Sequence, residues 1–89
     1  MLKLRRISQF KNDYKRCIKR GNDIAKLHIV IELLANGKKL DAKCRDHSLL
    51  GDYRDCRECH LEPDWLLIYK LTESEFILIR TGTHSDLFE

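Results

Sequence analysis

Apolar residues recur every three to four positions in two stretches of the first half of the chain, and this spacing predicts two helices. The first helix follows Ser8, a residue type that caps helix N-termini, and Gly21 provides a left-handed stop. The second helix starts at Asn22 or Asp23 and ends at Gly37. The apolar positions are Phe10, Tyr14, Cys17 and Ile18 in the first helix and Ile24, Leu27, Val30, Ile31, Leu33 and Leu34 in the second. Because the link between them is short, we expect an antiparallel helix hairpin.

The second half of the chain has a different pattern, with three runs of strand-forming residues. These runs are residues 53–61, 65–71 and 76–81, and they follow an expected loop over residues 38–52. The middle run, WLLIYKL, is nearly all apolar, which indicates a central strand covered on both faces. A short strand is also expected at residues 2–7, ahead of the helices.

The order of these elements is β-α-α-β-β-β, which predicts the α+β class: a mostly antiparallel sheet with the helix hairpin packed on one face. At 89 residues and 43% hydrophobic content, the chain is sized for a single domain over residues 1–89. The N-terminal MLKLRRISQF has no apolar signal-peptide core, and no apolar run approaches the roughly 18 residues needed to span a bilayer. We therefore expect a soluble, cytoplasmic protein with no membrane partner.

Charge is divided unevenly along the chain. The net charge is +3, but residues 1–45 hold 13 Lys and Arg against 4 Asp and Glu, a net of +9. Residues 46–89 hold 4 against 10, a net of −6. A basic half favours a polyanion such as nucleic acid as partner, although Lys and Arg on solvated helix faces would give the same count.

The cysteines raise the question of a zinc site. Cys56 and Cys59 form a CxxC motif that His60 follows directly, with Cys44 upstream. However, residues i and i+3 of a strand point to opposite faces, and there is no second CxxC. In a reducing cytosol disulfides are not expected either. We therefore interpret the cysteines as packing residues and expect no metal and no cofactor.

Side chains suited to acid–base chemistry gather after residue 45, namely Asp46, His47, Arg54, Glu58, His60, Glu62, Asp64, Arg80 and His84. Histidine accepts and releases a proton near neutral pH, and arginine neutralises phosphate charge. This set suits RNA cleavage through the 2'-hydroxyl, in which a base takes the 2'-OH proton and an acid protonates the departing 5'-oxygen.

Three of these candidates, and Trp65 beside them, also have a purely structural explanation. His47 would cap a loop, and His60 would be a hydrogen-bonded residue at a strand end. Trp65 opens the central strand, where an aromatic residue usually belongs to the core. Arg80 alternates with Phe76 on an otherwise apolar strand face, so its charge needs either a partner or a function.

Four segments resemble the RelE/ParE superfamily of bacterial toxins, in its YafQ branch of ribosome-dependent mRNA interferases. They are DHSLLG (residues 46–51), YRDCRE (53–58), HLEPDWLLIY (60–69) and RTGTHSDLF (80–88). The resemblance spans essentially the whole chain and is most specific in HxEPDW and RTGTHSxLF. It implies a RelE-like fold and the toxin of a type II toxin–antitoxin pair, which enters the ribosomal A site and cleaves mRNA without a metal.

The resemblance also implies the functional residues and partners. The catalytic set that it implies is His47, His60, Asp64, Arg80 and His84, and it implies that Trp65 and Phe88 bind the substrate; Arg54 is added to the substrate-binding set from its charge and position alone. As a hypothesis, Asp64 or His60 is the general base and His84 the general acid, and these two roles could be exchanged. The partners are a cognate antitoxin, the ribosome and mRNA, and operator DNA only together with the antitoxin.

Two other functions are compatible with this sequence. One is a ParE-like gyrase poison, which shares the fold but needs no acid or base. The other is a non-enzymatic nucleic-acid-binding module, which leaves the histidines unexplained. Ser48 stands where relatives often carry proline, so a decayed toxin that keeps antitoxin binding is a further alternative.

Overall fold

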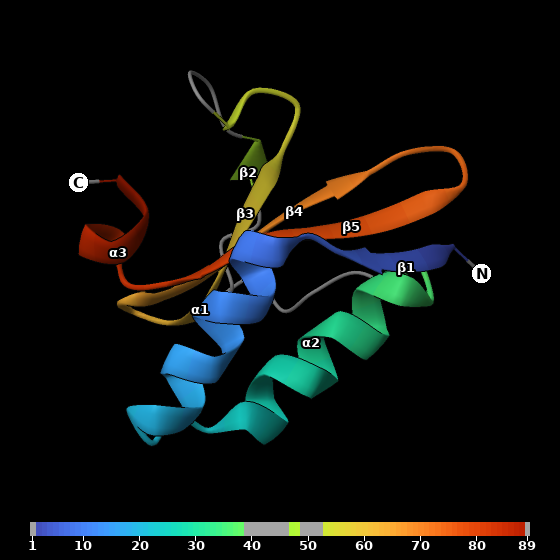
Figure 1. The fold of residues 1–89 in the computed structure, drawn as a ribbon. Coiled ribbons are helices and arrows are strands. Elements are labelled where there is room, and N and C mark those ends of the chain that lie inside the picture. Colours follow the sequence, from blue (N-terminus) through green and yellow to red (C-terminus); the bar gives the residue numbers. More distant parts are fainter. Residues whose placement is uncertain (1, 39–46, 49–52, 89) are drawn as a thin grey trace.

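Helices α1 (Ser8–Lys19) and α2 (Ile24–Ala35) form the helix pair that the apolar spacing predicts, and they run in opposite directions below the sheet (Figure 1). The computed structural model describes residues 2–38, 47–48 and 53–88. Each helix ends at a glycine in the left-handed conformation, Gly21 with φ 80° and Gly37 with φ 71°. The N–H of Gly21 returns to the carbonyl of Ile18 at 3.1 Å, which satisfies an acceptor that the helix end leaves open.

The start of α1 differs from the prediction. Ser8 is the first helical residue, and Ile7 precedes it in extended conformation without a side-chain hydrogen bond to the helix. The predicted cap at Ser8 is therefore wrong. The first turn of α1 is held instead by packing, since Phe10 is buried and Ile7 packs against the same core.

Five strands form one mixed sheet in the order β1-β5-β4-β3-β2. Their bounds are Lys3–Arg6 (β1), His47–Ser48 (β2), Arg57–Glu62 (β3), Trp65–Leu71 (β4) and Glu75–Gly82 (β5). Strand β1 pairs with β5 in parallel, and every other neighbouring pair is antiparallel. The predicted α+β fold and the mostly antiparallel sheet are confirmed.

Three details depart from the expected elements. Strand β3 begins at Arg57 because the preceding residues form a turn in which Asp55 has φ 68°. Strand β2 lies within the expected loop, whose residues 39–46 and 49–52 lie outside the described residues. A third helix, α3 (His84–Phe88), follows β5 where no element was predicted.

The central strand β4 is buried on both faces, as its apolar sequence predicts. One face joins the core under α1 and α2, where Trp65, Leu67 and Tyr69 are buried. The other face carries Leu66 and Ile68, which pack with Cys56, Leu87, Tyr53 and Ile79. Helix α3 and the turn before β3 therefore cover the second face, and this brings α3 close to the end of the sheet.

The cysteines lie in these two cores. Cys17 and Cys59 belong to the core under the helices, whereas Cys56 belongs to the opposite one. Burial raises the pKa of the Cys17 and Cys56 thiols, which keeps them protonated. The two cysteines of the CxxC motif thus face opposite sides, and Cys44 lies outside the described residues.

Within the described part of the chain, no helix is both long enough and apolar enough to cross a membrane.

Candidate active site

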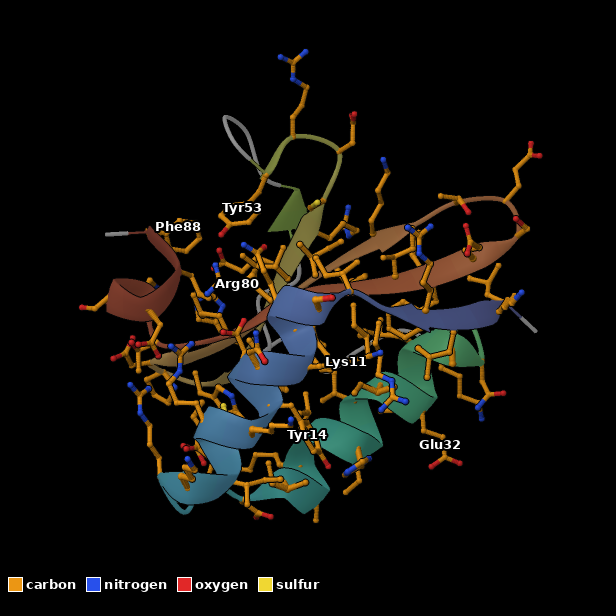
Figure 2. The ribbon with its side chains drawn as sticks, in the orientation of Figure 1. Lys11, Tyr14, Glu32, Tyr53, Arg80 and Phe88 are labelled. Atoms are coloured by element: carbon orange, nitrogen blue, oxygen red, sulfur yellow. The ribbon has the colours of Figure 1, made fainter. Side chains whose placement is uncertain are left out.

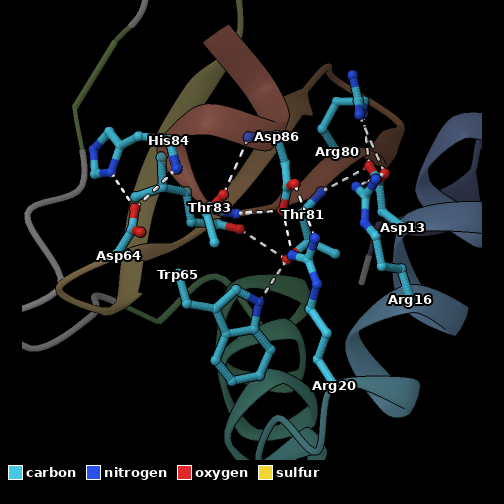
Figure 3. A network of polar contacts seen from close by, with 11 residues as sticks. Asp13, Arg16, Arg20, Asp64, Trp65, Arg80, Thr81, Thr83, His84 and Asp86 are labelled. Atoms are coloured by element: carbon cyan, nitrogen blue, oxygen red, sulfur yellow. Dashed lines mark hydrogen bonds and ion pairs between the residues drawn. The ribbon is translucent and has the colours of Figure 1, made fainter. Parts of the chain in front are cut away.

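A carboxylate and an imidazole meet at the end of the sheet. Asp64 lies in the turn between β3 and β4, and His84 is the first residue of α3. Asp64 Oδ1 lies 2.6 Å from His84 Nδ1 and accepts the backbone N–H of His84 at 2.9 Å (Figure 3). These backbone and side-chain bonds hold the pKa of the Asp64 carboxyl below its usual value. An ionised Asp64 therefore orients the imidazole and leaves Nε2 of His84 outside the pair.

A second imidazole approaches the first from β3. The ring centroids of His60 and His84 are 5.9 Å apart. His60 Nε2 lies 3.5 Å from Oε1 of Glu58, a carboxylate that is itself buried. Potential ligand atoms of Glu58, His60 and His84 all lie within 4.8 Å of one another. The three side chains form one cluster suited to proton transfer, and the same donor set would fit a Zn²⁺ ion.

Near the end of β5, Arg80 is held by a carboxylate from α1. Asp13 accepts hydrogen bonds from Arg80 Nε at 2.6 Å and Nη2 at 3.2 Å, and Arg80 Nη1 donates to the Tyr53 hydroxyl at 3.4 Å. The bonds to Asp13 raise the pKa of Arg80, so its guanidinium is a permanent cation.

The position of Arg80 corrects the predicted strand pattern. The β4–β5 register shifts so that Tyr69 pairs with Leu78 but Ile68 pairs with Arg80, and Ile79 is the extra residue on β5. Arg80 therefore does not continue the apolar row of β5. Such a bulge redirects a side chain, and here it accompanies an ion pair between Arg80 and α1.

The exposed ring of Phe88 lies beside the cluster of Glu58, His60 and His84. Phe88 is 47% exposed, and its ring stands edge-on to Tyr53 with centroids 5.7 Å apart (Figure 2). Its centroid is 6.3 Å from that of His84. The Tyr53 hydroxyl also donates to the Leu87 carbonyl at 3.2 Å. Tyr53 therefore links Arg80 to α3, and Phe88 presents an aromatic surface on which a base can stack.

Trp65 does not fit its predicted role. It is 2% exposed, and its indole Nε1 donates to Thr81 Oγ1 at 3.0 Å. Because the ring is enclosed in the core, it has no open face for a base. This burial does not support the predicted contact of Trp65 with RNA, and the observed role of Trp65 is to support β5 through its hydrogen bond to Thr81.

Helix α3 is fixed by a reciprocal cap and an ion pair. Thr83 Oγ1 accepts the N–H of Asp86 at 3.1 Å, and the Asp86 carboxylate accepts the N–H of Thr83 at 2.9 Å. Arg20, which follows α1, binds the same carboxylate at 2.6 and 3.2 Å. The Arg20 guanidinium holds the pKa of Asp86 far below its usual range. His84 is thereby carried on a helix that is tied to α1.

The structure brings most of the predicted site residues together. His60, Asp64, His84 and Phe88 surround one location, and Arg80 joins them through Tyr53. The backbone of His47 pairs with that of Glu58, which places His47 beside the cluster in the sheet register. Arg54 is exposed on the turn next to Tyr53.

Two contributing residues were not found from the sequence, Asp13 and Tyr53. Asp13 had a detectable signal, because it falls on the apolar face of the first predicted helix, three residues after Phe10 and four before Cys17. A charge at a core position needs a partner. Tyr53 had no such signal, since it opens a run that reads as a strand. Glu58 was a candidate without an assigned role.

Two comparisons of the sequence with known proteins agree with each other. A family model described as bacterial toxin of type II toxin–antitoxin system, YafQ, matches residues 2–89. The mRNA interferase toxin YafQ of Escherichia coli strain K12 is 44% identical over 81 residues, which cover 90% of this chain and 88% of that protein.

Solved structures agree with the sequence comparison. The crystal structure of the E. coli DinJ–YafQ toxin–antitoxin complex contains a similar chain, with a TM-score of 0.91 and 40% identity over 99% of this chain and 98% of that one. A metal-bound toxin from Helicobacter pylori gives a TM-score of 0.92 and 41% identity, over 99% of this chain and 100% of that one.

Proposed function

Because this chain belongs to the YafQ family of bacterial toxins of type II toxin–antitoxin systems, we propose that it is an endoribonuclease that cleaves mRNA in the ribosomal A site. Cleavage of translated mRNA stops protein synthesis, and a cognate antitoxin neutralises the toxin. The E. coli relative that matches most of the chain is an mRNA interferase, which supports RNA as the substrate.

The observation that carries the proposal is the approach of two imidazoles to each other, each with a carboxylate partner of its own. His60 has Glu58, and His84 has Asp64, while the ligand atoms of Glu58, His60 and His84 lie within 4.8 Å of one another. A general base and a general acid on one scissile phosphate must be neighbours, and each must be oriented by a further group.

The steps of cleavage follow from these positions. His60 takes the proton of the 2'-hydroxyl, the 2'-oxygen attacks the adjacent phosphorus, and His84 gives a proton to the departing 5'-oxygen. Asp64 is the weaker choice of base, because the bonds from His84 lower its pKa and stabilise the ionised form. The products are a 2',3'-cyclic phosphate and a 5'-hydroxyl end.

The remaining residues stabilise and position the substrate. The permanent charge of Arg80 offsets the negative charge that builds up on the phosphate. The exposed ring of Phe88 stacks on a base next to the cleaved bond. His47 orients the substrate or a neighbouring catalytic group, and exposed Arg54 contacts the RNA backbone.

No step needs a metal ion, since base, acid and cation are all supplied by side chains. We therefore propose metal-independent cleavage.

A basic surface on the first half of the chain suits the ribosome. Exposed Lys11, Lys15 and Lys19 follow one face of α1 at four-residue spacing, and exposed Lys3 and Arg6 add positive charge on β1. These residues bind ribosomal RNA phosphates and hold the acidic half, with its proton-transfer groups, on the mRNA. Binding through several phosphates falls steeply as salt rises, so ribosome affinity should drop at least 10-fold between about 50 and 200 mM salt.

The antitoxin is the second macromolecular partner. We expect an extended, partly acidic segment of it to cover the basic helices or the catalytic cluster, because blocking either one would stop cleavage on the ribosome. Operator DNA is contacted only by the toxin–antitoxin complex.

The decisive experiment is controlled expression of this chain in cells, with and without its cognate antitoxin, followed by mapping of mRNA 5' ends. We expect growth arrest that the antitoxin relieves, with cuts in frame with codons. Gyrase-dependent DNA breaks without mRNA cuts would favour the ParE-like function instead. RNA binding without any cleavage would favour the non-enzymatic binding module.

A further inference from the structure

The buried face of α1 carries a charge. Its buried residues are Phe10, Asp13 and Cys17, and Asp13 is 3% exposed. A carboxylate at a core position is costly unless hydrogen bonds and opposite charges compensate for the lost water. The contacts of Asp13 must therefore account for its place in the fold.

Both carboxylate oxygens of Asp13 are fully engaged (Figure 3). Oδ2 accepts from Arg80 Nε at 2.6 Å and from the Thr81 N–H at 3.2 Å. Oδ1 accepts from Arg80 Nη2 at 3.2 Å and from Arg16 Nη2 at 2.6 Å. Strand β1 pairs with β5 only as far as Leu78, so Asp13 binds β5 beyond the point where its strand neighbour ends.

This arrangement fixes the plane of the Arg80 guanidinium. One edge, formed by Nε and Nη2, is held by Asp13, and the remaining Nη1 lies against the Tyr53 hydroxyl. Tyr53 in turn contacts α3 through the Phe88 ring and the Leu87 carbonyl. Figure 2 shows Arg80 between α1 and Tyr53, and its Nη1 edge faces the Tyr53 hydroxyl rather than Asp13.

We propose that Asp13 is a positioning residue for RNA cleavage, which aims the guanidinium of Arg80 at the scissile phosphate without touching the RNA itself. This inference rests on the proposed function. A planar fork held at two nitrogens fixes direction as well as location, which a single contact does not.

Stability alone explains Asp13 poorly. Replacing a buried ion pair with apolar residues of similar volume is often neutral or stabilising, so burying Asp13 with Arg80 gains little for the fold. Accurate placement of charge at a reaction centre is different, because a displacement of about 1 Å can cost 100-fold in rate.

The first test is Asp13→Asn, which keeps the shape and one acceptor but turns an amide donor toward the guanidinium. We expect kcat for mRNA cleavage to fall by about 10- to 100-fold, with little change in KM. The pH profile should keep its two limbs, because His60 and His84 are untouched. A folded Asp13→Asn protein with wild-type kcat would overturn the inference.

Arg16→Gln is the matched control. It removes a guanidinium from the same carboxylate but leaves the bonds to Arg80 intact, so cleavage should remain at the wild-type level. The double variant Asp13→Asn with Arg16→Gln keeps the local formal charge of the wild-type cluster while Arg80 loses its carboxylate. It should be as slow as Asp13→Asn, and it replaces that variant if the single change prevents folding. If neither folds, Asp13 serves folding and the inference is wrong.

A double-mutant cycle with Arg80→Ala separates this inference from the proposed function. Arg80→Ala should lower kcat by about 100- to 1000-fold, and adding Asp13→Asn to it should lower kcat no further. A further drop of the same size as in the wild-type background would show that Asp13 acts independently of Arg80. Absence of cleavage by the wild-type protein on ribosomes would instead reject the function itself.

Discussion

Two aspartates hold two of the side chains on which the proposed chemistry depends, Arg80 and His84, and they do so in opposite settings. Asp13 is buried and joins Arg80, Arg16 and the backbone of β5. Asp64 is a surface residue, with its side chain 65% exposed, and both of its bonds come from His84, whose side chain is 53% exposed.

The difference in burial between the two aspartates matches the proposed roles of Arg80 and His84. A cation that only stabilises charge never exchanges its proton, so Arg80 can be fixed inside the protein. His84 gives its proton to the departing 5'-oxygen of the RNA, so the Asp64–His84 pair has to lie where the substrate can reach it. Exposed ion pairs contribute little to stability, and we therefore expect changes at the two aspartates to have different effects.

The largest effect should come from removing the exposed imidazole. His84→Ala deletes the proposed general acid and should lower kcat by about 100- to 10,000-fold while the fold is kept. Growth arrest on expression should disappear as well. Cleavage rate and thermal unfolding are measured on the same preparation.

Ser85→Ala is a matched control, because Ser85 is the exposed neighbour of His84 in α3. It should cleave like the wild type. Full activity of His84→Ala would reject the assignment of His84, and equal loss in both variants would point to damage of α3 rather than to missing chemistry.

Zinc should inhibit cleavage nearly as strongly, through the cluster that contains His84. Glu58, His60 and His84 offer three ligand atoms within 4.8 Å of one another. A bound Zn²⁺ would occupy both imidazoles and prevent proton transfer. Titration with Zn²⁺ should therefore abolish cleavage, whereas EDTA should leave the rate of the untreated protein unchanged. Activity that EDTA removes and Zn²⁺ restores would contradict metal-independent cleavage.

Asp64→Asn should have a smaller effect than loss of His84. The amide can still accept the backbone N–H of His84, but it no longer offers a carboxylate to orient the imidazole that acts as the acid. We expect a loss of kcat of roughly 10-fold, with the fold intact. If Asp64 were itself the general base, the loss would equal that of His84→Ala, so the ratio of the two variants distinguishes the roles.

Much of the fold could be predicted from the sequence, because local patterns determine it. The apolar spacing of two helices, the glycines at their ends and the continuous apolar run of β4 each depend on residues close together in the chain. Short elements escaped prediction for the same reason. Strand β2 has two residues and α3 has five, and neither is long enough to show a period.

The site was predicted only in part, because its partners come from distant segments. Asp13 and Arg80 are 67 residues apart in the chain, and Arg20 and Asp86 are 66 apart. The apolar spacing of the first helix indicated that Asp13 lies on the core face, but it did not indicate that Arg80 is its partner. Trp65 shows the opposite limit of sequence reasoning. The motif identifies the residue, but it does not reveal that the ring is enclosed in the core.

The smallest effect should come from Arg20→Gln, which tests whether an exposed ion pair helps to place His84. Arg20 is 45% exposed and binds Asp86 in α3. Its loss should lower the free energy of unfolding by no more than about 1 kcal/mol, or a few degrees in Tm, and kcat by a few-fold as α3 loosens. Lys26→Gln breaks an ion pair with Glu62 at 3.1 Å in which both side chains are exposed, unlike Asp86, whose side chain is 12% exposed, and it should leave kcat unchanged.

The pH dependence of this small effect has a definite sign. The folded-state pKa of Asp86 lies far below its usual value, so the ion pair stabilises the fold fully above the unfolded pKa of about 3.9. Its contribution is lost as pH falls through the lower folded-state value. The difference in Tm between wild type and Arg20→Gln should therefore be constant from neutral pH down to about pH 4.5 and shrink at lower pH. A difference that persists in acid would mean that Arg20 supports α3 through packing of its side-chain stem, and the placement of His84 would then not depend on charge at all.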